Sequence, residues 1–174
     1  MSARALEFLA LTASRSQELR GARREEIDLE HALWTVPAHR MKMEREHLVP
    51  LPEKAMVLLS RLPRLQGNPL VFPAPRGGEL SDMSLSAVMK RMHASELAAG
   101  RAGWLDKRNR RPAVPHGLRL TFRDWAAENA YSREMAEIAL AHRVGSEVER
   151  SYLRTELLEN RRDIMRAWSE FLSG

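Results

Sequence analysis

The chain has 174 residues, enough for one compact domain, and 44% of them are hydrophobic, which excludes a chain too polar to form a core. It contains no cysteine, so a disulfide framework, a thiolate metal site and a cysteine nucleophile are excluded. No apolar run approaches the roughly 18 residues that span a bilayer, and the first residues carry charge too early for a signal peptide.

The positive charge is concentrated in one segment. The net charge is +5 and the isoelectric point is about 10.2, values that suggest a polyanionic partner. Seven basic residues and one acidic residue, Asp106, lie between Arg101 and Arg123, and the rest of the chain is nearly neutral. The excess of positive charge is therefore a local feature of this segment.

The apolar spacing predicts a mainly α-helical chain with a small three-stranded antiparallel sheet. Helices are expected over residues 3–11, from Ser14 or Ser16 to about Gly21, and over 52–59, 84–99, 117–130, 133–141, 146–153 and 157–172. Short strands are expected at Ile27, Leu33–Val36 and His47–Pro50, and an extended piece at Leu70–Pro73. Residues 100–115 form a basic loop, which is the best candidate for a mobile or DNA-facing segment.

Two clusters in the N-terminal half have candidate chemistry. Arg15 and Glu18 are three residues apart and can meet on one helix face; taken alone, a surface ion pair is the simpler interpretation. Around Lys42, an extended backbone would turn Arg40, Lys42 and Glu44 to one side and the two intervening methionines to the other. A flexible charged hairpin tip is the simpler interpretation of this stretch.

Two further clusters lie in the C-terminal half. His116 and Arg119 at the start of a helix suit a phosphate, and a capping histidine with a solvent-exposed arginine is an equally supported interpretation. His142 precedes Tyr152 by ten residues, a pair that a buried histidine and a core tyrosine also explain. A tyrosine nucleophile needs neighbouring cations, because its pKa is ordinarily about 10. No metal-ligand spacing or phosphate-binding glycine loop is present in the sequence.

The order of these clusters is more specific than any one of them. Thr-x-x-Arg-x-x-Glu-Leu around Arg15 is followed by Lys42, by His-x-x-Arg at His116 and Arg119, by Leu-x-His, and by Tyr152. In this order the chain resembles the catalytic domain of the tyrosine recombinases, the phage integrase family, from Leu6 to Leu172. Ile-Asp-Leu, Val-Pro-Ala-x-Arg-Met-Lys, Glu-His-Leu-Val-Pro-Leu, Val-Phe-Pro and His-Gly-Leu-Arg are similar to prophage and integrative-element integrases.

The resemblance implies six catalytic residues: Arg15, Lys42, His116, Arg119, His142 and Tyr152. The two arginines would clamp the scissile phosphate, His116 would assist as an acid/base or hydrogen-bonding group, and His142 would hydrogen-bond the phosphate. Lys42 would protonate the leaving 5′ oxygen, and Tyr152 would form a 3′-phosphotyrosyl link. Glu18 would support the first arginine without touching substrate. No metal ion and no cofactor is implied.

The resemblance also implies partners. These are double-stranded DNA attachment sites, a recombinase tetramer on DNA that is monomeric when free, and accessory DNA-bending proteins, in the cytoplasm of a bacterium. The residues expected to contact DNA are Arg40, Arg108, Arg110, Arg111 and Arg123. The final helix is expected to pack on its own domain or on a neighbour in the tetramer.

Two departures from the family pattern are visible. Ala13 stands where many relatives have glycine, which would alter the turn slightly. The chain begins at the first helix of the catalytic domain, so residues 1–174 are expected to be that single domain, without the DNA-binding domains that precede it in full-length members. Two other functions remain open: a type IB topoisomerase-like strand transferase, and a catalytically inactive basic helical DNA-binding module.

Overall fold

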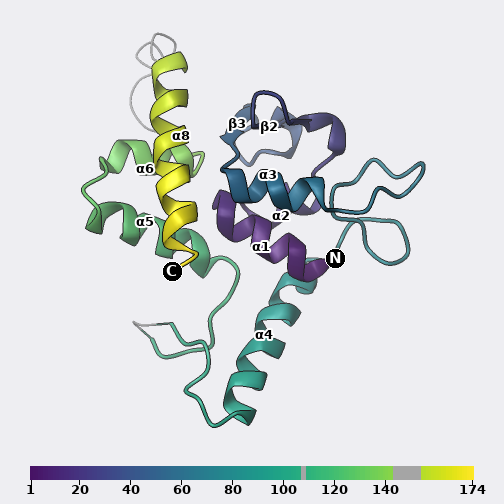
Figure 1. Cartoon of the computed structure of the whole chain (residues 1–174), viewed down its shortest axis with the longest axis vertical. Coiled ribbons are helices and arrows are strands. Elements are labelled where there is room, and N and C mark those ends of the chain that lie inside the picture. The colour runs from purple at the N-terminus through teal and green to yellow at the C-terminus, as the bar shows by residue number, and fades with distance from the viewer. Residues whose placement is uncertain (107–108, 143–153) are drawn as a thin grey trace.

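The computed structural model describes residues 1–106, 109–142 and 154–174, and it shows two groups of helices, a small sheet and one projecting helix (Figure 1). The helices are α1 (Ser2–Thr12), α2 (Ser16–Arg20), α3 (Glu53–Ser60), α4 (Met83–Ala98), α5 (Gly117–Glu128), α6 (Arg133–Ala139) and α8 (Arg154–Phe171). The predicted mainly α-helical class with a small sheet is confirmed. The helix expected over residues 146–153 lies outside the described residues.

The sheet is the predicted antiparallel meander. Strands β1 (Ile27–Asp28), β2 (Leu33–Val36) and β3 (His47–Pro50) pair in chain order, and Trp34 of β2 lies opposite Val49 of β3. Trp34 and Val36 are buried while their neighbours along β2 are half-buried, as alternation on a one-sided sheet requires. The sheet therefore fixes both ends of residues 37–46, the connection that carries Lys42.

The backbone around Lys42 is not extended, so the prediction of alternating faces is wrong. Ala38–Arg40 forms a 3₁₀ turn, which has three residues per turn rather than the two-residue repeat of a strand. The chain turns again where the Glu44 N–H donates to the Met41 carbonyl at 2.9 Å, with Glu44 at φ 49°. Met41 is buried and Met43 is 37% exposed, so the two methionines do not share a face.

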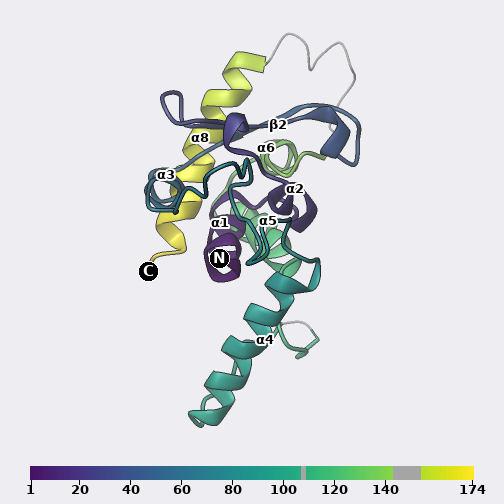
Figure 2. The same ribbon diagram turned by 90° about the vertical axis from the view of Figure 1, so that its right-hand side faces the viewer.

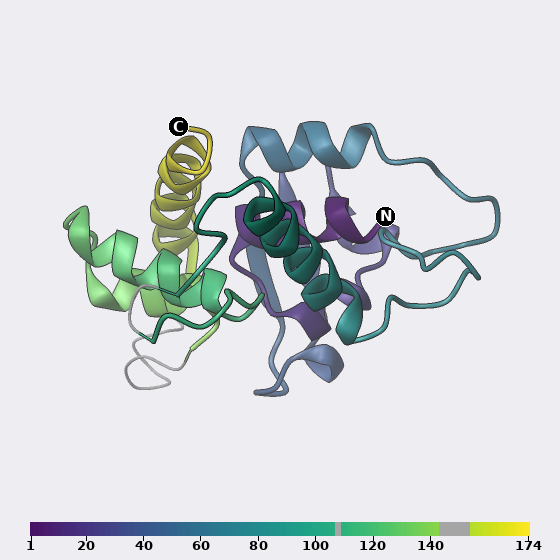
Figure 3. The same cartoon turned by 90° about the horizontal axis from the view of Figure 1, so that it is seen from below.

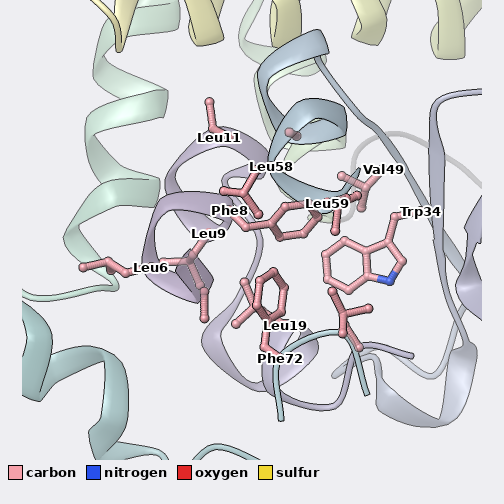
Figure 4. Packing of buried hydrophobic residues seen from close by; sticks show 14 of the residues in the cluster. Leu6, Phe8, Leu9, Leu11, Leu19, Trp34, Val49, Leu58, Leu59 and Phe72 are labelled. Atoms are coloured by element: carbon pink, nitrogen blue, oxygen red, sulfur yellow. The ribbon is translucent and has the colours of Figure 1, made fainter. Parts of the chain in front are cut away.

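One hydrophobic cluster joins α1, the sheet, α3 and the start of α4. Its centre is a group of aromatic rings, in which Phe8 lies 5.6 Å from Trp34 and 5.3 Å from Phe72 between ring centroids (Figure 4). Leu19 of α2 is fully buried in the same cluster. The packing fixes α2, and with it the preceding residue, Arg15, against the end of α1.

A second cluster joins α5, α6 and α8, the green and yellow helices that lie together on one side of α1 in Figure 3. Phe122 of α5 meets Trp168 of α8 edge-on at 5.4 Å, and Trp125 lies 5.2 Å from Trp168. The Trp168 indole N–H donates to the Ala10 carbonyl at 2.7 Å, which ties α8 to α1. The seam between the two clusters runs past the C-terminal ends of α1 and α6.

Helices α1 and α6 both end at this seam with an alanine in the left-handed conformation. Ala13 follows α1 at φ 47°, and Ala141 follows α6 at φ 54°, a conformation that costs an L-residue about 1 kcal/mol. At α6 the Ala141 N–H donates to Ile138 O at 3.0 Å and the His142 N–H donates to Glu137 O at 2.9 Å, which is the Schellman pattern. This stop ends α6 at Ala139, two residues before the predicted end.

Helix α4 projects from the rest of the molecule, as Figure 2 shows, and buries only Leu85 and Val88. The basic segment after it folds back toward the helix, since the Trp104 N–H donates to His93 Nδ1 at 2.9 Å and Leu105 forms an antiparallel bridge with Pro112. Within the described residues, no helix combines the length and the apolar character needed to cross a membrane.

Candidate functional site

Arg15 immediately precedes α2 and is held by Glu18. The Arg15 backbone N–H donates to Glu18 Oε2 at 2.9 Å, and Arg15 Nη1 lies 2.7 Å from Glu18 Oε1. The Glu18 side chain is 3% exposed and that of Arg15 is 22% exposed. The two residues therefore form a partly buried ion pair that fixes the guanidinium. The interpretation as a surface ion pair is excluded.

Arg119 is buried at the seam between the two hydrophobic clusters. Although it lies in the first turn of α5, it is only 5% exposed. Its Nη1 donates to the Ala13 carbonyl at 2.5 Å and its Nη2 donates to the Leu140 carbonyl at 2.6 Å. One guanidinium thus joins the loop after α1 to the end of α6, and the interpretation as a solvent-exposed arginine is excluded.

The charge of Arg119 is poorly compensated. Burial and then the neighbouring Arg15 lower its pKa to about 10 from the ordinary 12.5, while Glu18 and Glu137 act in the opposite direction. It stays cationic at neutral pH, but both of its short hydrogen bonds go to neutral carbonyl groups. A phosphate oxygen placed beside Arg119 and Arg15 would relieve this desolvation and repulsion.

His142 lies beside this guanidinium. The left-handed Ala141 turns the chain so that the His142 ring approaches α6, where Nδ1 contacts the Glu137 carboxylate. The other ring nitrogen, Nε2, lies 3.5 Å from Arg119 Nη2. The structure therefore brings Arg15, Arg119 and His142 to one place.

His116 occupies the residue before α5. It is exposed, its φ of −63° and ψ of −29° are helical, and its side chain makes no capping hydrogen bond. The interpretation as a capping histidine is therefore excluded. The Arg119 N–H donates to the His116 carbonyl at 3.2 Å, which places the two residues on the same first turn of α5.

Lys42 is exposed on the turn between β2 and β3. Among the described residues, no hydrogen bond or ion pair joins it to Arg15, Arg119 or His142. Arg40, predicted to contact DNA, instead pairs inside the molecule with Glu26, and its side chain is 14% exposed. This inward pair lies in the stretch where the chain leaves the extended path before Lys42.

The remaining predicted residues divide into three groups. Tyr152 and Arg108 lie outside the described residues. Arg110 and Arg111 are exposed on the basic segment, where Arg110 has φ 57° and Asn109 Oδ1 accepts the Arg111 N–H at 2.8 Å. Arg123 lies on α5 with its Nε 3.0 Å from Glu137 Oε1, and its side chain is 44% exposed.

His47 and Glu137 were missed from the sequence. Burial, then Arg161, lowers the pKa of His47 to about 3; Arg119 and Arg15 act in the same direction, and the Ala139 backbone opposes them. His47 is therefore a neutral side chain at the edge of the arginine site. Its position at the start of a strand, five residues after Lys42, was the available signal; Glu137 became evident only once the turn after α6 was known.

Two surface hollows of the described residues lie away from the arginines. These hollows, of about 360 and 260 Å³, both border α3 at Glu53 and Lys54, and neither is lined by Arg15, Arg119 or His142. In the part of the chain that the structure describes, no cluster of three or more His, Cys, Asp or Glu residues is arranged to hold a metal ion.

Comparison with known proteins supports a single family. The chain is 34% identical to the prophage integrase IntA of Escherichia coli K12, over 94% of this chain and 37% of that protein, and 33% identical to the integrase of enterobacteria phage P4, over 97% and 39%. It thus spans about two fifths of the length of these relatives.

Solved structures share the fold at low sequence identity. The integrase from mycobacterium phage Brujita matches with a TM-score of 0.65 and 18% identity, over 95% of this chain and 50% of that one. The XerH recombinase bound to its difH substrate matches with a TM-score of 0.58 and 20% identity, over 91% and 45%. The model of the phage integrase family matches residues 1–157. The chain belongs to the phage integrase family.

Proposed function

We propose that this chain is the catalytic part of a site-specific DNA recombinase, which cuts and rejoins DNA through a 3′-phosphotyrosyl link to Tyr152. The observation that carries the proposal is the pair of fixed arginines. Arg15 is held by Glu18, and Arg119 is held by the Ala13 and Leu140 carbonyls, so both cations are in position before substrate arrives. Prepositioned cations are the expected means of stabilising charge on a phosphate in the transition state.

The proposed reaction conserves the number of phosphodiester bonds. The Tyr152 hydroxyl oxygen attacks the phosphorus, the bond from phosphorus to the 5′ oxygen breaks, and Lys42 gives a proton to that oxygen. His116, at the exposed start of α5, accepts the proton that the Tyr152 hydroxyl loses, and His142 donates to a non-bridging oxygen. A 5′ hydroxyl from another strand then reverses the step, so rejoining requires no ATP.

The proposed partner is duplex DNA. Arg110 and Arg111 are exposed and would contact the phosphate backbone, and Arg108 belongs to the same proposal. Such contacts position a protein on DNA without reading sequence. Assembly into a tetramer on DNA, a monomer in its absence, and accessory DNA-bending proteins complete the proposal.

Covalent trapping tests this function. The probe is a pool of random-sequence duplexes, labelled at the 5′ end of one strand and nicked so that the downstream fragment, which carries the new 5′ hydroxyl, dissociates after cleavage. We expect a labelled species that survives denaturing electrophoresis, that Tyr152→Phe abolishes and that Tyr131→Phe retains. Tyr131 is the matched control because it is the second of the chain's two tyrosines and packs against Trp125 at 5.4 Å.

Two results would reject this function. An adduct that persists in Tyr152→Phe would exclude the proposed nucleophile. DNA binding by wild type without any adduct would instead indicate the inactive DNA-binding module.

A further inference from the structure

Glu137 of α6 lies between two residues that the sequence singled out for other reasons. One carboxylate oxygen, Oε2, contacts His142 Nδ1, and the other, Oε1, lies 3.0 Å from Arg123 Nε. We propose that Glu137 is a positioning residue for strand transfer: it holds the His142 ring with Nε2 directed at the phosphate bound by Arg119. This inference rests on the proposed function and deepens it.

The backbone at the end of α6 brings Glu137 and His142 into contact. The left-handed Ala141 brings the His142 N–H back to the Glu137 carbonyl at 2.9 Å. Two residues five apart in sequence are thereby joined through both backbone and side chain. The ring orientation is set by the helix stop and the carboxylate together.

The carboxylate is itself held in place. Its side chain is 14% exposed, and Arg123, which contacts it, lies one helical turn after Arg119 on α5. Burial raises the pKa of Glu137, but the His142 hydrogen bond, Arg123 and Arg133 outweigh burial and lower it below its usual range. Glu137 is thus an anion that contacts His142 through Oε2 and forms an ion pair with Arg123 through Oε1, an atom that accepts no hydrogen bond among the described residues. Helix α5 supplies both the phosphate-binding Arg119 and the cation that faces Glu137.

This arrangement determines where protons lie on the ring. A carboxylate only accepts hydrogen bonds, so His142 Nδ1 must carry a proton. A phosphate oxygen also only accepts, so the ring donates to it only when Nε2 carries a second proton. An anion beside Nδ1 fixes the tautomer and the orientation of the ring, as a carboxylate does in other histidine pairs, and leaves Nε2 as the atom that faces the phosphate.

Charged groups from several elements act on the two residues that contact the ring. Arg15 and Glu18 act on the pKa of Arg119, and Arg123 and Arg133 act on the pKa of Glu137. Only Glu137 contacts Nδ1 directly among the described residues. A substitution that removes its charge but keeps its shape therefore isolates its contribution from that of the arginines.

The experiment compares Glu137→Gln with Glu134→Gln, which removes one negative charge from an exposed position of the same helix. The adduct assay is run with the nicked duplex pool over a range of pH, and DNA affinity is measured separately. We expect Glu137→Gln to form adduct about 10-fold or more slowly, with unchanged DNA affinity. The loss should appear in adduct formation and not in DNA binding, because the amide can both donate and accept and so no longer fixes which nitrogen of the ring carries the proton. Glu134→Gln should match wild type at every pH.

Nitrogen NMR of the His142 ring in the DNA-free protein gives a second readout. We expect a protonated Nδ1 in wild type and a changed ring spectrum in Glu137→Gln. A ring with unprotonated Nδ1, a spectrum unchanged by the substitution, or a wild-type rate and pH profile in Glu137→Gln would overturn the inference. If wild type forms no adduct, the proposed function fails, and the NMR result still decides whether Glu137 positions the ring. If Glu137→Gln does not fold, the wild-type spectrum decides.

Discussion

Replacing Arg119 by lysine should destabilise the fold even though the charge is kept. The guanidinium spans two acceptors, the Ala13 carbonyl and the Leu140 carbonyl, through two different nitrogens. A lysine carries all its donors on one nitrogen, which cannot occupy the positions of both Nη1 and Nη2, so we expect one buried carbonyl to lose its partner. An unsatisfied buried acceptor costs about 1–3 kcal/mol.

The cost is large enough to measure by thermal unfolding. For a chain of this size each kcal/mol shifts the midpoint by about 2–4 °C, so a central cost of about 2 kcal/mol predicts a fall of about 4–8 °C. The assay is calorimetry or circular dichroism at pH 7. Arg110→Lys, on the exposed basic segment, is the matched control and should not change the midpoint.

An Arg119→Lys midpoint equal to that of Arg110→Lys would refute the reasoning. It would mean that the two carbonyl contacts of Arg119 do not hold the seam between α1 and α6 together. The adduct yield is a separate readout, because loss of the bidentate phosphate contact lowers it whether or not stability changes.

Two further predictions concern groups near this seam. The pKa of His47 is lowered to about 3 in the folded state, so the unfolded state binds more protons below about pH 6.5 and stability falls as the pH falls. Between about pH 6.5 and 5, urea unfolding should show that the free energy of unfolding of wild type falls by about 1.5 kcal/mol more than that of His47→Gln. Equal falls in the two proteins would exclude a neutral His47 in the folded state. Glu18→Gln should lower the free energy of unfolding by about 2 kcal/mol, below the full cost of breaking a buried pair because Arg15 reaches solvent. Glu7→Gln breaks the exposed Arg4–Glu7 pair, also three residues apart, and should cost under about 1 kcal/mol; equal losses would contradict the difference in burial.

The helices were predictable because the apolar spacing that indicates a helix is a local feature of the sequence. Apolar spacing gave α1, α4 and α5 to within two residues, and the meander followed from its short β-branched and aromatic runs. The turn before Lys42 was not predictable in this way. Arg40 pairs inward with Glu26, 14 residues away, and a tertiary contact of that kind leaves no periodic pattern in the sequence.

The residues of the candidate site were predicted from the sequence better than their spatial arrangement was. The order of motifs identified Arg15, Arg119 and His142, which the structure brings together. The burial of Arg119 was not evident, because its acceptors are backbone carbonyls 21 and 106 residues away. Glu137 was missed because its contact depends on the left-handed turn at Ala141, a position where alanine gives no sequence signal for that conformation.

Mass spectrometry of the trapped adduct tests the central claim most directly. After digestion with nuclease and trypsin, which cuts after arginine, Tyr152 lies in the tetrapeptide 151–154 and Tyr131 in the decapeptide 124–133. We predict a nucleotide phosphate on the tetrapeptide, attached through the tyrosine oxygen to the 3′ end of the DNA. A modification on the decapeptide, on another side chain, or on neither peptide of an otherwise active protein would contradict the assignment of Tyr152 as the nucleophile.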